Sequence, residues 1–234
     1  KFISPVSKEI FDREALLGVS ITGWMNNPEV LFNEKILEKG AKIVKEVNRQ
    51  VADIIGINPA ARTTCVKPSG NASVLLQTAS GIHAEHSPRY IRNIQMNKES
   101  EITQAIVKSN PYMVEESVWS ANGTDVVISF PIVPHKGSMY KEELYGVKHL
   151  ELVAKAQKHW VLAGTNEELC ADEGVRHNVS NTIIVDDWDE VEKYVFENRY
   201  SFSGISFLSM SGDKDFNQAP NTAVIDDKQM VKKY

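Results

Sequence analysis

Apolar side chains recur at helical spacing between residues 34 and 55. The stripe is made by Leu37, Ala41, Val44, Val47, Val51 and Ile54. This spacing gives an α-helix one apolar face. Asn33 can cap the start of the helix, and Gly56 suits the left-handed position just past its end. The pattern therefore predicts a long amphipathic helix from about Glu34 to Ile55.

Shorter β-prone and helix-prone runs alternate along the rest of the chain. We expect strands over residues 62–66, 90–96, 114–119, 125–131, 179–185 and 203–209. We expect helices from about residue 71 and over residues 99–109, 148–163 and 187–198, with a short helix or tail at the end. Asn122-Gly123 lies between two β-prone runs, which is typical of a β-hairpin. The alternation predicts an α/β layered or barrel fold, with residues 1–234 in one domain.

The composition is that of an ordinary globular protein, with 42% hydrophobic and 24% charged residues. The formal net charge of −5 argues against a nucleic-acid surface, which needs a basic face. Two cysteines suit a reducing cytoplasm better than a disulfide scaffold, and no apolar run is long enough to span a membrane. We therefore expect a cytoplasmic protein that binds neither nucleic acid nor membrane. The chain begins at Lys1 rather than Met, so a fragment and a processed product both remain open.

The segment Lys67-Pro-Ser-Gly-Asn-Ala-Ser73 lies between a predicted strand and a predicted helix. The first turn of a helix carries backbone N–H groups without partners and the positive end of the helix dipole, so it can bind an anion. Gly70 has no side chain to block a close approach, and neighbouring polar side chains can add hydrogen bonds. Pro-Ser-Gly is also a common turn, so an ordinary capped turn remains the alternative. The spacing of a Walker loop is absent.

Five sequence blocks occur in a characteristic order. They are Leu17–Pro28 (LGVSITGWMNNP), Arg62–Ser73 with Ser80–Arg92, Arg176–Thr182, Phe202–Leu208 and Gln218–Pro220. In this order and at these spacings, the chain resembles the carboxy-terminal part of the catalytic barrel of adenosylcobalamin-dependent (class II) ribonucleotide reductases, nearest the ribonucleoside-triphosphate type. The resemblance covers roughly residues 16–220.

The resemblance implies part of a ten-stranded α/β barrel around a finger loop. It implies reduction of ribonucleotides to deoxyribonucleotides by thiyl-radical chemistry, with adenosylcobalamin as cofactor. It assigns the substrate phosphates to the turn formed by Pro68, Ser69, Gly70, Asn71, Ala72 and Ser73. The family usually has Thr where this chain has Asn71. The resemblance also suggests that the substrate or cofactor side of the site is lined by Ser80, Gly81, His83, His86 and Arg89.

The cysteines depart from the family pattern. The radical cysteine of the family lies in an Asn-x-Cys-x-Glu motif, whereas Cys65 lies in Thr-Thr-Cys-Val-Lys and Cys170 in Glu-Leu-Cys-Ala-Asp. The cysteine pair of the family's carboxy terminus is missing too. We therefore assign no catalytic residue within this chain, and we expect activity to need an amino-terminal half that carries the radical cysteine. A non-catalytic nucleotide- or phosphate-binding module that retains the fold is the alternative. Class I relatives share the barrel but use a separate radical-generating subunit.

Two clusters of possible metal ligands fit a local structural role better than a metal site. His83 and His86 have the spacing H-x-x-H, but no C-x-x-C accompanies them and Pro88 favours a loop. A metal-dependent enzyme built on His83, His86 and a cysteine stays a third hypothesis, and our assignment is that no metal is bound. In the acidic cluster, Asp187 is followed by Glu190 three residues later, which fits a helix capping box.

Overall fold

The computed structural model describes residues 2–210, 216–224 and 228. The α-helices are α1 (Pro5–Glu14), α2 (Pro28–Leu31), α3 (Glu34–Ile55), α4 (Gly70–Leu75), α5 (Glu101–Ser109), α6 (Gly146–Ala156) and α7 (Trp188–Glu197). The strands are β1 (Val19–Ser20), β2 (Thr64–Cys65), β3 (Tyr90–Asn97), β4 (Val114–Glu116), β5 (Asp125–Ile132), β6 (Thr182–Val185), β7 (Ser206–Ser209) and β8 (Asn221–Ala223). The short helix or tail expected at the end of the chain lies largely outside the described residues.

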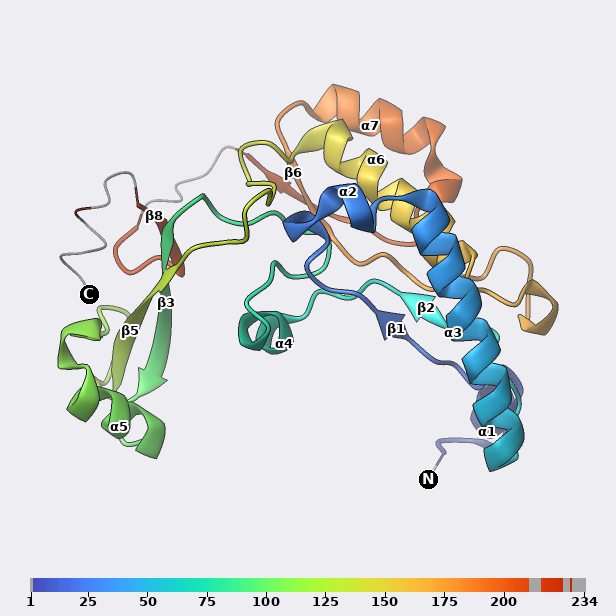
Figure 1. The fold of residues 1–234 in the computed structure, drawn as a ribbon, viewed down its shortest axis with the longest axis horizontal. Helices are drawn as coiled ribbons and strands as arrows, with labels where there is room; N and C mark the ends of the chain where they lie inside the picture. The colour runs from blue at the N-terminus through green and yellow to red at the C-terminus, as the bar shows by residue number, and fades with distance from the viewer. Residues whose placement is uncertain (1, 211–215, 225–227, 229–234) are drawn as a thin grey trace.

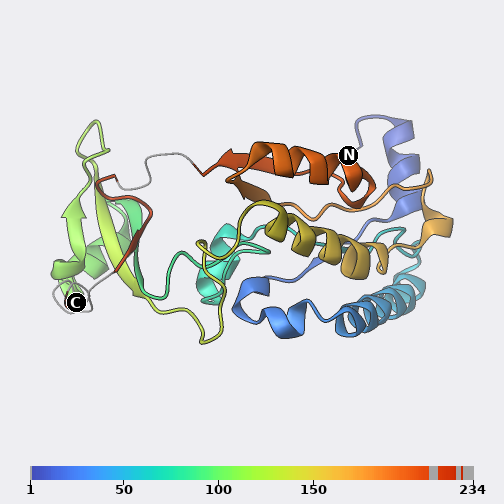
Figure 2. The same cartoon turned by 90° about the horizontal axis from the view of Figure 1, so that it is seen from above.

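The larger part of the molecule is built on parallel strands (Figure 1). β1 pairs in parallel with β2, and β6 pairs in parallel with β7. The two pairs are joined where Val66 bridges Val179 in parallel, because the Ser180 N–H donates to the Val66 carbonyl over 2.9 Å. The strand order is therefore β1-β2-β6-β7. α6 and α7 pack against each other on the same side, over β6 (Figure 2).

A smaller antiparallel lobe stands at the other end of the molecule (Figure 1). Its strand order is β4-β5-β3-β8, with α5 beside it. β3 pairs with β5 along its whole length, from Tyr90 opposite Ile132 to Asn97 opposite Asp125. The hairpin predicted around Asn122-Gly123 is confirmed, since β4 pairs antiparallel with β5.

The α/β prediction is confirmed, but a closed ten-stranded barrel is not formed by the part of the chain that the structure describes. The parallel strands make an open arch rather than a ring, with β1 and β7 as its outer strands. Several strands are also shorter than predicted, since only Thr64–Cys65 of residues 62–66 and Thr182–Val185 of residues 179–185 form continuous ladders. At the ends of these segments, Val66 and Val179 form a single bridge to each other, and the Thr63 N–H donates to the Gly164 carbonyl over 3.0 Å.

The long predicted helix is confirmed with both of its caps. Asn33 Oδ1 accepts a hydrogen bond from the Ile36 N–H over 3.3 Å, and Gly56 ends the helix at a φ of 73°. Its apolar stripe is covered only at the beginning. Leu37 and Ala41 are fully buried, whereas Ile54 is 82% exposed. In the second half of the stripe, Val47 and Val51 are also about half exposed, so the described parts of the chain cover this half only partly.

The core lies between α3, α6 and the parallel strands. Its fully buried members include Trp24, Met25, Leu37, Leu150 and Ile183. α6 continues into a π-helical turn over Gln157–Leu162, and this wider turn places Trp160 over β2. The Trp160 indole N–H donates to the Cys65 carbonyl over 3.0 Å. The helices that the structure describes include none with the length and apolar composition needed to cross a membrane.

Candidate functional site

The turn singled out by the sequence links β2 to α4, as predicted. Ser69 occupies the N-cap position of α4, but its side chain makes no capping hydrogen bond. Gly70, Asn71 and Ala72, in the first turn, are exposed. A Cβ built on Gly70 would meet no atom within 4 Å. The start of α4 is therefore open, without a side-chain cap over its backbone N–H groups.

Thr22 holds this turn in place from the neighbouring loop. Its hydroxyl oxygen accepts hydrogen bonds from the Ser69 hydroxyl over 3.2 Å and from the Gly81 N–H over 3.1 Å. The same hydroxyl donates to the Ala79 carbonyl over 3.0 Å. One side chain thus ties together the loop after β1, the turn before α4 and the segment after α4. Thr22 lies within the sequence block Leu17–Pro28, but nothing in the sequence pattern marks it as a contact of the turn before α4.

Gly81 packs directly against the turn. It has a φ of 54°, a conformation that favours glycine, and a Cβ built on it would lie 3.6 Å from the Cα of Pro68. The segment that begins at Ser80 is therefore brought under the turn, although the two are separated by α4 in sequence.

Two serine side chains of the predicted phosphate-binding turn already form hydrogen bonds to other groups of the chain. Ser73 is buried, and its hydroxyl donates to the carbonyl of Ser69. Ser69 donates to Thr22, as described above. Asn71 and the backbone of Gly70 remain at the exposed start of the helix. Backbone N–H groups, rather than serine hydroxyls, are thus the donors that the open turn presents.

His83 is fixed as a neutral imidazole. Its Nδ1 lies 2.8 Å from the Ser80 carbonyl, so this nitrogen carries the proton, and its Nε2 accepts from the Thr182 N–H over 3.4 Å. Burial lowers the pKa of His83, and the hydrogen bond to Ser80 offsets this only in part. His83 therefore anchors the segment to the start of β6.

His86 and Arg89 lie further along the same segment and do not join His83. The His86 ring packs at 5.5 Å from the ring of Tyr90, and its Nε2 lies 3.3 Å from the Lys141 ammonium. Arg89 is exposed. Among the described residues, no group of three His, Cys, Asp or Glu side chains is placed to hold a metal ion.

Both cysteines are free and half-buried. Burial raises the pKa of the Cys65 thiol, although Lys67 acts in the opposite direction. Burial also raises the pKa of Cys170, again against the effect of a nearby cation, Arg62. Each thiol is therefore held in its protonated, less reactive form.

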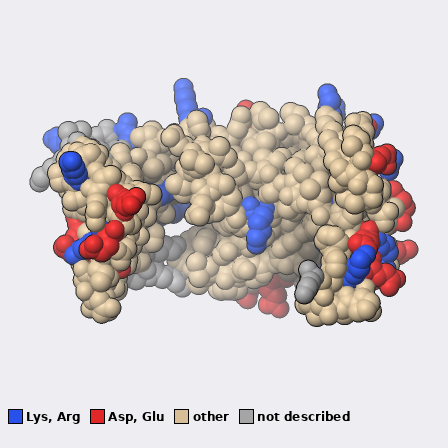
Figure 3. All heavy atoms as spheres, turned by 90° about the horizontal axis from the view of Figure 1, so that it is seen from below, with Lys and Arg blue, Asp and Glu red and all other residues tan. Residues whose placement is uncertain are grey.

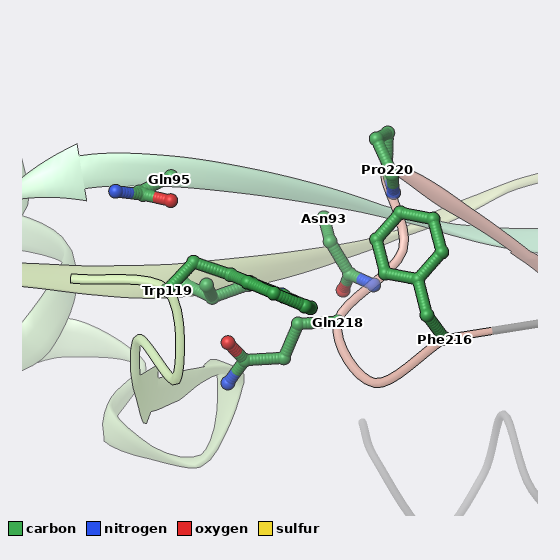
Figure 4. Close-up of a pocket in the computed structure, with 7 residues that line it drawn as sticks. Asn93, Gln95, Trp119, Phe216, Gln218 and Pro220 are labelled. Carbon is green, nitrogen blue, oxygen red and sulfur yellow. The ribbon is translucent and has the colours of Figure 1, made fainter. Parts of the chain in front are cut away.

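The last sequence block, Gln218–Pro220, hydrogen-bonds to the antiparallel lobe. Gln218 accepts from the Val118 N–H over 2.9 Å and donates to the Glu116 carbonyl over 2.8 Å. Figure 4 shows Gln218 beside Trp119. The ring centroids of Trp119 and Phe216 are 5.8 Å apart. The hollow between these rings and β3 has a volume of about 490 Å³. The Gln218 amide at the border of this hollow is thus engaged within the chain, where it ties the last sequence block to the end of β4.

The acidic residues before α7 act as the capping pattern predicts. Asp187 Oδ1 accepts from the N–H groups of Asp189 and Glu190 over 3.0 and 3.1 Å. Asp186 points instead to the start of α6, where its Oδ1 would lie 2.6 Å from a Cβ built on Gly146.

Comparison with known proteins supplies the context for this arrangement. No family model matches the chain. The adenosylcobalamin-dependent ribonucleoside-triphosphate reductase of Euglena gracilis is 26% identical over 224 residues, which are 93% of this chain and 28% of that protein. A probable adenosylcobalamin-dependent ribonucleoside-triphosphate reductase of Dictyostelium discoideum is 29% identical over 172 residues, 74% of this chain and 21% of that protein.

A solved structure agrees with these relatives. The crystal structure of a B-12 dependent (class II) ribonucleotide reductase matches with a TM-score of 0.79 and 17% identity, over 97% of this chain and 34% of that chain. At this identity the match shows a shared fold. The chain spans between about a fifth and a third of the length of these proteins. The resemblance indicated by the five sequence blocks is thus confirmed, and the chain is similar to a segment of the adenosylcobalamin-dependent (class II) ribonucleotide reductases.

Proposed function

We propose that this chain is a segment of a ribonucleotide reductase and that it supplies the binding site for the substrate phosphates. The complete enzyme would convert ribonucleotides to deoxyribonucleotides by thiyl-radical chemistry. The curated relatives are named as reductases of ribonucleoside triphosphates, which supports this substrate class. No residue of this chain is assigned to the radical or to the redox pair.

The observation that carries the proposal is the open start of α4. The first-turn residues Gly70, Asn71 and Ala72 are exposed, and no side chain caps them. Their N–H groups and the helix dipole attract an anion. Thr22 and Gly81 fix the turn from below, so little ordering is needed when a phosphate binds. We assign the phosphate contacts to Pro68–Ser73, chiefly through the backbone.

The open arch supports a role as one part of a larger barrel. β1 and β7 each have a partner on one side among the described residues, and parallel strands are normally covered and paired. Apolar side chains also remain exposed beside these strands, among them Leu17 and Leu208. Figure 3 shows a face whose middle carries few charged side chains. We propose that an amino-terminal portion of the reductase pairs with these edges and completes the ten-stranded barrel.

Adenosylcobalamin would be bound by the complete enzyme and would supply the initial radical. His83 does not fit a direct contact to it through its ring, because both ring nitrogens already have partners in the chain. Ser80, Gly81 and His83 instead support the substrate or cofactor side by fixing the backbone beneath the phosphate turn. His86 and Arg89 lie beyond this anchored part of the segment, and we propose that they line the substrate or cofactor side of the complete enzyme.

The test is ribonucleotide reduction with added adenosylcobalamin, for this chain alone and for this chain mixed with an amino-terminal portion that carries an Asn-x-Cys-x-Glu motif. We expect deoxyribonucleotide only from the mixture. A mixture without activity, in which the two portions nevertheless associate, would count against the proposal.

The alternative is a nucleotide- or phosphate-binding module without catalysis. Such a module would need only the open start of α4, whose exposed first-turn residues lie within this chain. The same mixing experiment separates the two functions, because a binding module would bind nucleotide equally well alone and would never yield product.

A further inference from the structure

A buried histidine of α6 reaches the segment that lies beneath the phosphate turn. His149 is 3% exposed, and its Nε2 lies 2.7 Å from the Ile82 carbonyl oxygen. Asn181, just before β6, donates to the same oxygen over 3.0 Å. Ile82 directly follows Gly81, which packs against Pro68. The helix layer therefore contacts the floor of the turn through one carbonyl group.

The proton of His149 is placed for this contact. A carbonyl oxygen can only accept a hydrogen bond, so Nε2 is the protonated nitrogen and donates to Ile82. Burial, reinforced by the nearby His83, lowers the pKa of His149 to about 4, although the hydrogen bond to Ile82 acts in the opposite direction. The ring is therefore neutral at pH 7, and its Nδ1 carries no proton.

The second ring nitrogen indicates that this imidazole is not kept for stability alone. His149 Nδ1 is buried and has no hydrogen-bond partner among the residues that the structure describes. A buried acceptor without a partner costs folding free energy. An apolar side chain would fill the same space without that cost. The feature that distinguishes histidine at this position is thus its Nε2–H donor.

The segment beneath the turn is held from two sides. From the loop after β1, the Thr22 hydroxyl accepts from the Gly81 N–H over 3.1 Å. From the side of α6 and β6, His149 and Asn181 donate to the carbonyl of Ile82, the next residue. These contacts fix the peptide groups on both sides of Ile82. Loss of the His149 donor would loosen the segment directly next to the residue that packs against the turn.

We propose that His149 is a positioning residue for the phosphate turn. By donating to the Ile82 carbonyl, it keeps Gly81 against Pro68 and so fixes the backbone that presents the open start of α4. It acts through Gly81 and does not contact the phosphate. The inference rests on the proposed function for the identity of the ligand, whereas the coupling between His149 and the turn does not.

The test uses the full chain and compares His149→Phe with His149→Gln. Phe keeps a buried ring but cannot donate, whereas the Gln amide nitrogen can take the place of Nε2. In the ligand-free chain, we expect His149→Phe to shift the amide NMR resonances of residues 69–72 and His149→Gln to leave them close to those of the wild type. In calorimetry, His149→Phe should weaken binding of inorganic triphosphate about three- to tenfold. His149→Gln should restore most of the affinity.

Val153→Ala is the matched control, because it removes buried apolar volume from the same helix and leaves His149 intact. It should lower the melting temperature and leave the turn resonances and the triphosphate affinity unchanged. Nitrogen NMR of the wild type adds a check that needs no variant, since the proton of His149 should lie on Nε2.

Four results would overturn the inference: a wild-type His149 proton on Nδ1, turn resonances that do not move in His149→Phe, a His149→Gln variant that behaves like His149→Phe, or an equal loss of affinity in Val153→Ala. A different result would count against the proposed function alone. In that case the turn resonances move in His149→Phe and recover in His149→Gln, but the wild type binds no triphosphate. The positioning role of His149 would then stand without a phosphate ligand.

Discussion

The Ser69 hydroxyl donates to the Thr22 hydroxyl oxygen over 3.2 Å, although 47 positions separate the two residues. This contact occupies the side chain that would otherwise cap α4. It leaves the first-turn N–H groups of the helix without a side-chain acceptor and holds the turn rigid. An anion can then take the place of the missing cap.

Replacing Gly70 by Val tests the open turn. The added side chain would meet no atom of the chain within 4 Å at its Cβ, so folding should be almost unaffected. It would instead cover the approach to the backbone N–H groups. We expect triphosphate binding to weaken about tenfold or more, measured by calorimetry on the wild type and the variant. The control is Leu75→Ala, at the exposed far end of the same helix, which should bind as the wild type does. Unchanged affinity in the Gly70 variant would remove the turn from the site.

Replacing Thr22 by Val tests the anchor of the turn. The variant loses the acceptor for Ser69 and Gly81 and the donor to Ala79. We expect a loss of about 1–3 kcal/mol in the free energy of unfolding and weaker triphosphate binding. Thr22→Ser keeps the hydroxyl, so it should retain most of the affinity. If Thr22→Val and Thr22→Ser bind alike, the hydroxyl does not position the turn.

Replacing Gly164 by Ala tests the contact between β2 and the end of the π-helical turn. A Cβ on Gly164 would lie 1.9 Å from Thr64 Oγ1 and 2.7 Å from its Cγ2. The overlap must displace the helix end or the strand, at about 1–3 kcal/mol or more in urea denaturation. A second change, Thr64→Ala, removes both atoms and should recover part of the loss. Gly204→Ala is the control, since its Cβ would make only an ordinary 3.5 Å contact. Equal stability of the Gly164 and Gly204 variants would contradict the contact.

Glu14 makes stability depend on pH. Burial acts to raise the pKa of Glu14, but hydrogen bonds from Arg62 and Arg13 outweigh it and lower the pKa. A carboxyl whose pKa is lowered in the folded state stabilises the fold above its unfolded pKa, about 4.3. This contribution is lost as the pH falls through the lower, folded value.

We therefore expect Glu14→Gln to reduce the free energy of unfolding by about 3 kcal/mol at pH 7. The difference from the wild type should shrink below about pH 4. Glu46→Gln breaks the exposed pair with Lys42 and should cost less than about 1 kcal/mol. A difference between Glu14→Gln and the wild type that stays constant from about pH 7 to about pH 3 would show that the ion pair is not its source.

Local sequence determined the elements with strong start and stop signals. The caps Asn33, Asp187 and Gly56 lie where the pattern placed them, because a cap acts within a few residues of itself. The strand–turn–helix order around Gly70 was also predictable, and so was the resemblance carried by the five blocks. The sequence pattern did not predict α1, although Ser4 caps it and Pro5 opens it. Its apolar side chains, such as Ile10 and Phe11, remain exposed, so the helix lacks the apolar face that identifies the longer helices.

Tertiary structure alone decided how the site is assembled. No spacing indicates that Thr22 meets Ser69, that Gly81 lies against Pro68, or that His83 hydrogen-bonds to Ser80 and Thr182. These contacts arise because parallel strands bring distant loops to one edge, where hydrogen bonds are satisfied by whichever groups the fold makes neighbours.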